Sequence, residues 1–191
     1  PGLEELLQSL LTKGLVDELV PYAPTKFSRE QKRARTSTYA SLADIGDSVT
    51  GIADHFLNEH TKREVGRQQC LSQGCTYFMS IDADEYYKAD QLEAVKRFME
   101  ENPVYDGCAC LMRYYFKSPT IELLPPDDTN HVPLMYKLKP GTEFKLAHPY
   151  PCLVDPTRTV AGVQRFKIFD RSFVEMHHYS FVRKPQGILS K

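Results

Sequence analysis

A chain of 191 residues is the size of a single domain and can bury a continuous core. Its 24 Lys and Arg residues nearly balance its 25 Asp and Glu residues, and no block of like charge suggests a nucleic-acid partner or a membrane-binding tail. No stretch approaches the roughly 18–20 apolar residues of a spanning helix, and no signal peptide is recognisable. We therefore expect a cytoplasmic chain without a membrane span. Peripheral association with a membrane stays open.

The spacing of apolar residues in the first part of the chain predicts helices and strands in alternation. In chain order these are a helix over 2–13, a strand over 15–22, a basic loop or frayed helix over 24–38, a strand over 47–55, a helix over 59–72, a strand over 76–81, a helix over 90–101 and a strand over 107–116. Alternation of this kind favours an α/β sheet with mostly parallel strands flanked by helices. We expect Val65 and Leu71 to face inward from the helix over 59–72, and the strand over 76–81 to be central and buried on both faces.

From Ser118 onward, frequent prolines divide the chain into short pieces. The apolar, β-favouring pieces predict strands near 134–138, 143–146, 165–169 and 173–182, with a turn at 170–172. We therefore expect one domain over 1–191, with an α/β half over 1–117 and an irregular, loop-rich half over 118–191.

The acidic run over 82–85, Asp-Ala-Asp-Glu, follows the apolar strand. Where a strand bends into a loop, Asp82 and Asp84 could converge on one ion, and carboxylate oxygens suit Mg²⁺ or Mn²⁺. The crevice beyond the carboxyl ends of strands is a common ligand site in open α/β sheets. The competing interpretation is a solvated acidic turn in which an aspartate caps the following segment.

A second group of polar residues lies near the end of the chain, where His177 and His178 are followed by Arg183 and Lys184. Neighbouring residues on a strand point to opposite faces, so at most one histidine readily joins a metal site. The alternative is a packed core histidine beside an exposed one. The basic pair suits a diphosphate, although a solvated strand end explains it as well.

Arg63 and Arg67 are spaced four apart and share one face of the predicted helix. They could reach the phosphate or ribose of a nucleotide. Pairing with Glu59 and Glu64 on the helix surface explains them equally well.

Several common functional motifs are missing from the sequence. It has no G-x-S-x-G, H-E-x-x-H, G-x-x-x-x-G-K-[ST] or G-x-G-x-x-G, the usual signals of hydrolases, zinc proteases, P-loop enzymes and Rossmann dehydrogenases. The five cysteines are odd in number and form no C-x-x-C pair, so we expect reduced, mostly buried thiols rather than a disulfide framework or a zinc site. They are Cys70, Cys75, Cys108, Cys110 and Cys152.

Three segments taken together resemble the family 2-like glycosyltransferases of the GT-A fold, which are nucleotide-diphospho-sugar transferases. The segments are KREVGR over 62–67, GCTYFMSIDADE over 74–85 and MHHYSFVRK over 176–184. The resemblance covers roughly residues 2–185 in order, and the joint occurrence of the segments is more specific than any one of them. It implies a GT-A-like fold in which 1–117 binds donor and metal and 118–191 lies on the acceptor side.

The resemblance also implies site residues. Asp82 and Asp84 match the metal and donor motif, and one of His177 and His178 matches the histidine that completes the metal site in several GT-A enzymes. The expected activity is a hexosyltransferase-like transfer from a nucleotide-sugar to a saccharide or other hydroxyl acceptor, with Mn²⁺ or Mg²⁺ as cofactor. Further donor contacts are expected from Arg63, Arg67 and Arg183, which are weaker candidates.

The family usually opens with a strand that holds the nucleotide base, directly before the helix matched here by 1–13. That first strand has no counterpart in the sequence. We expect either that the chain given lacks its first element or that its nucleotide subsite differs.

An inverting transfer also needs a carboxylate that deprotonates the acceptor hydroxyl. Four aspartates in the loop-rich half are candidates between which the sequence does not choose, and a retaining enzyme does not require such a base. They are Asp127, Asp128, Asp155 and Asp170.

Two rival functions use the same residues. A metal-dependent phosphohydrolase or phosphotransferase would use the acidic run, although Tyr86 replaces the Thr that the D-x-D-x-T motif of aspartyl-phosphate enzymes requires. A non-catalytic nucleotide-sugar-binding relic of the fold would keep the architecture without the chemistry, and the missing first strand favours it.

Overall fold

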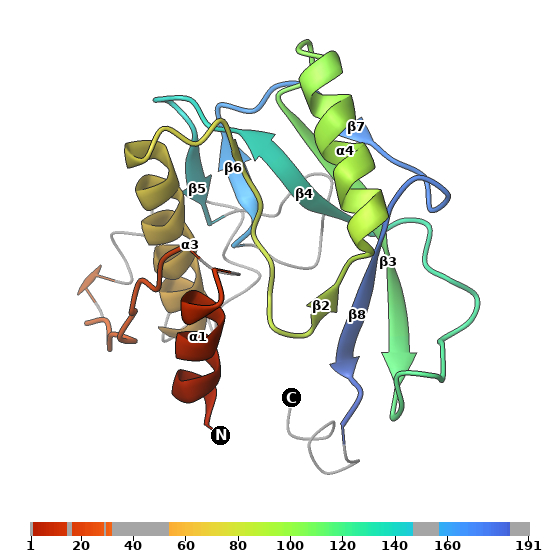
Figure 1. Cartoon of the computed structure of the whole chain (residues 1–191), viewed down its shortest axis with the longest axis horizontal. Coiled ribbons are helices and arrows are strands. Elements are labelled where there is room, and N and C mark those ends of the chain that lie inside the picture. The colour runs from red at the N-terminus through yellow and green to blue at the C-terminus, as the bar shows by residue number, and fades with distance from the viewer. Residues whose placement is uncertain (1, 15–16, 29, 32–53, 147–156, 184–191) are drawn as a thin grey trace.

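The computed structural model of the protein describes residues 2–14, 17–28, 30–31, 54–146 and 157–183. These residues form a mixed α/β structure (Figure 1). Its elements are α1 (Leu3–Thr12), α3 (Asp54–Ser72), β1 (Tyr77–Phe78), β2 (Glu85–Tyr86), α4 (Ala89–Glu101), β3 (Gly107–Phe116), β4 (His131–Lys137), β5 (Glu143–Lys145), β6 (Thr159–Ala161), β7 (Phe166–Ile168) and β8 (Glu175–Phe181). None of the described helices is both long enough and apolar enough to cross a membrane.

The main sheet has the strand order β1-β4-β3-β8-β2, and β7 pairs with β3 outside this path. Only the β3–β7 and β3–β8 pairs are parallel, whereas β1–β4, β3–β4 and β2–β8 are antiparallel. The expectation of mostly parallel strands is therefore wrong for the described sheet. The physical reason is that β4 reverses direction after β3 and pairs with it, while the short strand β2 pairs in the opposite direction with β8. Antiparallel pairs of this kind need no helical crossover.

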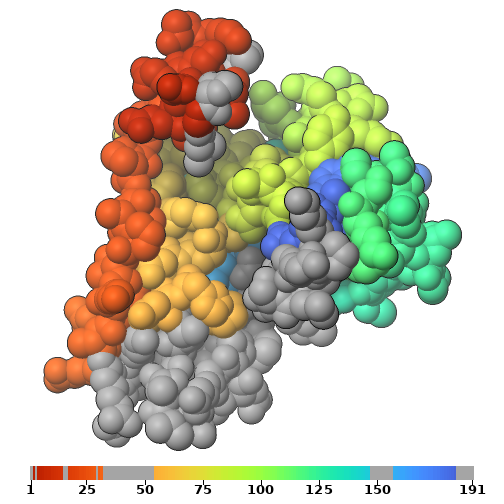
Figure 2. Space-filling view, turned by 90° about the horizontal axis from the view of Figure 1, so that it is seen from below, coloured from red at the N-terminus to blue at the C-terminus, as the bar shows by residue number. Residues whose placement is uncertain are grey.

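Four strands nevertheless run in one direction, since β7 is also parallel to β3. Strand β4 is antiparallel to both β1 and β3, and β8 is parallel to β3, so β1, β3 and β8 end at the same side of the sheet, here called the carboxyl edge. Figure 1 shows the arrowheads of β3 and β8 pointing the same way. Figure 2 views the molecule from this side, and the blue atoms of β8 lie between the yellow-green atoms around β2 and the green atoms of β3 and the loop after it.

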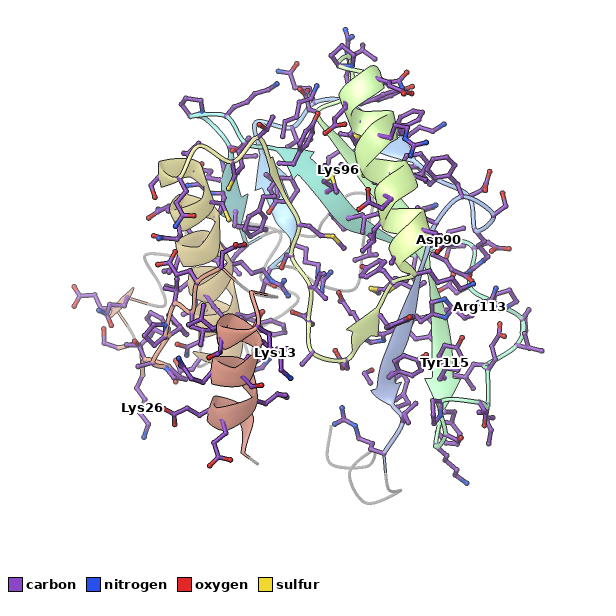
Figure 3. All side chains as sticks on the ribbon, in the orientation of Figure 1. Lys13, Lys26, Asp90, Lys96, Arg113 and Tyr115 are labelled. Atoms are coloured by element: carbon purple, nitrogen blue, oxygen red, sulfur yellow. The ribbon has the colours of Figure 1, made fainter. Side chains whose placement is uncertain are left out.

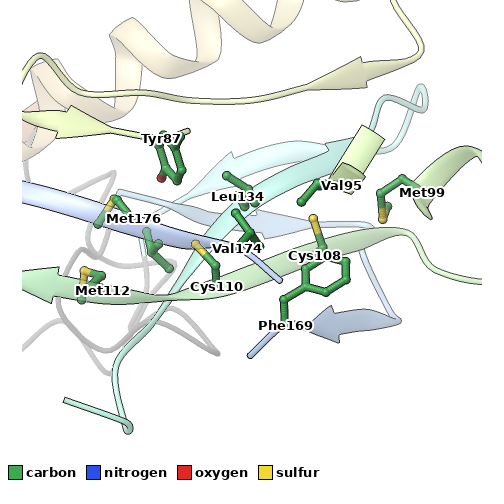
Figure 4. Packing of buried hydrophobic residues seen from close by; sticks show 11 residues of the cluster. Tyr87, Val95, Met99, Cys108, Cys110, Met112, Leu134, Phe169, Val174 and Met176 are labelled. Carbon is green, nitrogen blue, oxygen red and sulfur yellow. The ribbon is translucent and has the colours of Figure 1, made fainter. Parts of the chain in front are cut away.

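The main core lies between α4 and the sheet (Figure 4). Val95 and Met99 of α4 are fully buried, as are Cys108 and Cys110 of β3. The predictions of a helix over 90–101 and a strand over 107–116 are both confirmed, because the α4 pattern repeats at helical spacing and β3 is buried on both faces at its start. The expectation of mostly buried thiols holds for β3 only, since Cys75 is exposed.

The predictions for the segments before α4 have mixed outcomes. The helix over 2–13 is confirmed by α1, and the helix over 59–72 by α3, which begins earlier, at Asp54. The central strand over 76–81 is wrong: β1 has two residues, lies at one end of the described sheet and leads to an exposed Ile81. Residues 17–22 form no strand, and most of the basic stretch over 24–38 and of the strand over 47–55 lies outside the described residues.

The loop-rich half follows its predicted strands more closely. Strands β4, β5, β7 and β8 correspond to the expected pieces, and residues 171–173 form a turn between β7 and β8. Strand β6 was not expected, and it pairs with β5 in a separate two-stranded sheet. That small sheet lies beside α3. The Glu64 carboxylate of α3 accepts a hydrogen bond from the Phe144 amide of β5 at 3.1 Å.

Candidate functional site

The inward face of α3 carries arginines. Arg63 and Arg67 are 4% and 6% exposed, whereas Val65 is 36% exposed. The expected orientation of this helix, with Val65 inward, is therefore wrong. The reason is electrostatic, because the two guanidinium groups pair with partly exposed carboxylates, and these ion pairs repay the desolvation of their charge.

The acidic run over 82–85 is a turn, closed by a hydrogen bond from the Glu85 amide to the Asp82 carbonyl at 3.1 Å. The Asp82 carboxylate accepts two hydrogen bonds from Arg63 Nη2, at 3.0 and 2.9 Å. Arg158 Nη2 donates to the same carboxylate at 2.7 Å and also pairs with Glu85. The turn is acidic, as the alternative interpretation supposed, but Asp82 is held by two arginines rather than by solvent.

Burial and charge act in opposite directions on the two carboxylates of this cluster. Burial alone would raise the pKa of Asp82, but the positive charges of Arg158 and Arg63 outweigh it and the pKa is lowered. Burial also raises the pKa of Glu85, and there the attraction of Arg158 does not compensate. Asp82 is therefore the carboxylate of this cluster whose charged form the fold favours.

Asp84 faces a different partner. Strand β2 pairs with β8 so that Glu85 lies opposite His178, and the Tyr179 amide donates to the Asp84 carbonyl at 2.8 Å. This pairing brings Asp84 Oδ2 to 3.9 Å from His178 Nε2. The turn and the histidine pair, which are far apart in the sequence, thus meet at the carboxyl edge.

The two histidines lie on opposite faces of β8, as expected for neighbours on a strand. His178 contacts the ring of Tyr114, which packs against the core beneath α4. His177 lies on the other face, where its Nδ1 is 2.7 Å from the Tyr115 hydroxyl, and Figure 3 labels Tyr115 near the end of β3. Burial lowers the pKa of His177, although Glu175, 3.7 Å from its Nε2, raises it. His178 is therefore the histidine beside the acidic turn.

The other expected donor contacts have different surroundings. Arg67 is paired with Glu64, with Nε 2.9 Å from Oε2, so the helix-pairing interpretation accounts for this arginine. Arg63 combines both interpretations, because its Nη2 is 3.1 Å from Glu59 Oε1 while it also binds Asp82. Arg183 is exposed just beyond β8 at the carboxyl edge.

The candidate catalytic aspartates take part in local structure. The Asp127 carboxylate accepts hydrogen bonds from the backbone of residues 129 and 130, and Asp170 does the same for residues 172 and 173. Asp128 pairs with Arg171 at 3.0 Å. These bonds are typical of aspartates that close turns, while Asp155 lies outside the described residues.

Asp84 and His178 are the two predicted metal ligands that the structure brings close to each other. Two ligands of one octahedral ion lie roughly 3–4 Å apart when each is about 2.1 Å from it, and the 3.9 Å between Asp84 and His178 fits this range. Within the described part of the chain, no three His, Cys, Asp or Glu side chains cluster closely enough to hold an ion by themselves. A metal here would thus complete its coordination with oxygens of water or of a ligand, as Mg²⁺ commonly does.

No family model, curated protein or solved structure matches this chain. The candidate site is therefore defined by the contacts of this chain alone.

Arg158 is the site residue that the sequence did not reveal. It is 3% exposed and joins Asp82 to Glu85. It lies between a proline-rich stretch and the short strand β6, where no periodicity marks an inward position. The only sequence signal was indirect, since three carboxylates within four residues need nearby positive charge if they are to be buried.

Proposed function

We propose that this chain is a metal-dependent glycosyltransferase of the GT-A type, which transfers a sugar from a nucleotide-diphospho-sugar to a hydroxyl group of an acceptor. The observation that carries the proposal is the β2–β8 pairing, which brings the Asp84 carboxylate to 3.9 Å from His178 Nε2. The three segments that resemble the family are neighbours in space. The turn over 82–85 contacts Arg63 of the first segment through Asp82, and it lies beside His178 of the third through Asp84.

The residues of the chain have distinct roles in this proposal. Asp84 and His178 would hold Mn²⁺ or Mg²⁺, and the bound ion would neutralise the charge that develops on the departing diphosphate. Asp82 orients the turn through Arg63 and Arg158 rather than joining Asp84 on the ion. Arg183, exposed at the same edge, is the candidate for direct contact with the diphosphate.

The direction of the strands supports the GT-A assignment at a finer level than the mixed α/β class. The acidic turn follows β1, and β3 and β8 run in the same direction as β1. A ligand at the carboxyl edge would be in the usual position for an α/β sheet. Helix α3, which carries the first of the three resembling segments, precedes the turn, as the resemblance leads us to expect.

The test is Mn²⁺-dependent release of nucleoside diphosphate from a panel of nucleotide-sugars, with and without candidate saccharide acceptors. We expect D84N and H178N to lose both turnover and Mn²⁺-dependent binding of nucleoside diphosphate, measured by calorimetry. D90N is the matched control, because Asp90 is exposed in the first turn of α4, and H177N is the control for the histidine. Unchanged binding and turnover in D84N would disprove the proposed metal site.

The second candidate is the non-catalytic relic that binds nucleotide-sugar without transferring it. It is favoured by the finding that the described residues bring only a carboxylate and an imidazole together, with no third protein ligand. Binding of nucleoside diphosphate with Mn²⁺ but no turnover with any donor and acceptor would support it. Release of inorganic phosphate instead of nucleoside diphosphate would indicate the phosphohydrolase.

A further inference from the structure

The carboxyl end of α3 has a specific backbone arrangement. The Cys75 amide donates to the Cys70 carbonyl at 3.0 Å, and the Gly74 amide donates to the Leu71 carbonyl at 3.1 Å. Gly74 has a positive φ of 75°. These are the two hydrogen bonds and the left-handed glycine of a Schellman motif, in which the side chains at the positions of Cys70 and Cys75 commonly touch.

In this protein both of those positions are cysteines. Burial raises the pKa of the Cys70 thiol, and the neighbouring Cys75 thiol raises it further. Cys75 is exposed and Cys70 is partly exposed, so reagents in solution can reach this pair. The short backbone hydrogen bond between the two residues keeps their main chains close, as a disulfide requires.

The cysteines of β3 provide an internal comparison. Cys108 and Cys110 are also near each other in sequence, but both are fully buried. Burial raises the pKa of Cys108 to about 12 and raises that of Cys110 further. Among the described cysteines, Cys70 and Cys75 are thus an accessible pair whose backbones are hydrogen-bonded, whereas Cys108 and Cys110 are an inaccessible pair.

We propose that Cys70 and Cys75 are a thiol oxidation site that forms a reversible disulfide across the end of α3. The oxidant is a small-molecule disulfide such as glutathione disulfide. The exposed Cys75 thiolate attacks one sulfur of glutathione disulfide and releases one glutathione thiolate, giving a mixed disulfide. The Cys70 thiolate then attacks Cys75 Sγ and releases the second glutathione thiolate, so that two thiols are oxidised and one glutathione disulfide is reduced to two glutathiones.

The position of this disulfide gives it a structural consequence. It would close a ring over residues 70–75, and this ring links α3, which carries Arg63, to the segment that leads through β1 to Asp82. Oxidation would fix the end of the helix in its capped conformation by restricting the alternatives open to the unfolded chain. We expect slower hydrogen exchange at the Gly74 and Cys75 amides in the oxidised protein.

The test uses the whole folded chain in buffers of increasing oxidised-to-reduced glutathione ratio, followed by thiol blocking, unfolding and trypsin digestion. The sequence places the cysteines in three separate tryptic peptides, over 68–88, 98–113 and 146–158. We expect the 68–88 peptide to lose the mass of two hydrogens and to escape blocking, while the 98–113 peptide stays reduced. A 68–88 peptide that stays reduced, carries glutathione, or is linked to another peptide would overturn the proposal.

The order of the two steps is tested with single variants that keep a similar size. In C70S the resolving thiol is missing, so Cys75 should accumulate the glutathione adduct. In C75S the attacking thiol is missing, so Cys70 should remain mostly free. An equal adduct on Cys70 in C75S would contradict the assigned order.

Discussion

Asp82 and Asp84 are two residues apart in one turn, but they have different surroundings. The Asp82 carboxylate is held by two arginines whose side chains are 2% and 4% exposed. The two carboxylates are similarly exposed, 31% for Asp82 and 35% for Asp84, but the neighbour of Asp84 is His178, 3.9 Å away. The difference teaches that the two carboxylates of a D-x-D motif need not share one task, since one is paired with two buried arginines and the other lies beside a histidine.

The largest effect is expected from removing the arginine that the sequence did not reveal. Arg158→Met leaves Glu85, whose side chain is 3% exposed, without its cation, and deprives Asp82 of one of its two. Breaking a buried ion pair in this way costs about 3–5 kcal/mol, and we expect the free energy of unfolding in denaturant to fall by this amount.

The matched control for Arg158 is Arg183→Met, because Arg183 is exposed beyond the end of β8. This variant should change the free energy of unfolding by no more than about 0.5 kcal/mol. If the two variants had the same stability, the buried cluster would not support the fold.

The comparison is sharpened by exchanging each aspartate for asparagine. D82N keeps the shape of the side chain but removes the charge that Arg63 and Arg158 neutralise, so we expect a loss of about 1–3 kcal/mol in the free energy of unfolding. D84N should change stability by no more than about 0.5 kcal/mol, while Mn²⁺-dependent binding of nucleoside diphosphate is lost. The reverse order of stabilities would show that the roles of the two aspartates have been exchanged.

Local patterns in the sequence were sufficient for much of the fold. The helix spacing of Val95 and Met99 predicted the buried face of α4, and the apolar run after Gly107 predicted β3. The predicted orientation of α3 was wrong because Arg63 is buried and Val65 is exposed. The burial of Arg63 depends on Asp82, which another segment supplies. Strand direction failed for a similar reason, since pairing partners such as β2 and β8 are set by tertiary contacts.

The candidate site was predictable in part. The two sequence segments that carry Asp84 and His178 were identified, and the alternation of side chains on a strand showed that only one histidine could face the turn. Which one it is depends on the register of β8 against β2, and a shift by one residue would have selected His177 instead. The contact between Arg158 and Asp82 joins residues that are 76 positions apart in the sequence. No local sequence pattern predicts it.

The smallest effect is expected at His177, which distinguishes the two faces of β8. Burial lowers its pKa below the ordinary value of 6.5, ahead of the opposing effect of Glu175. As pH falls from above 6.5 through the lowered value, the unfolded chain binds a proton that the folded protein still excludes, so His177 makes the protein less stable. Glu85, whose pKa is raised above 4.5 by burial, acts in the opposite direction as pH falls.

A comparison between the wild-type chain and H177N isolates the histidine, because Glu85 is common to both. Asparagine can keep a hydrogen bond to the Tyr115 hydroxyl in place of the 2.7 Å contact of Nδ1, so the fold should be retained. Melting temperatures measured between about pH 5 and pH 7 should rise less steeply with pH in H177N than in the wild type. The same loss of pH dependence in H178N but not in H177N would mean that the histidine excluded from solvent is the one beside Asp84, and the separation of the two faces would fail.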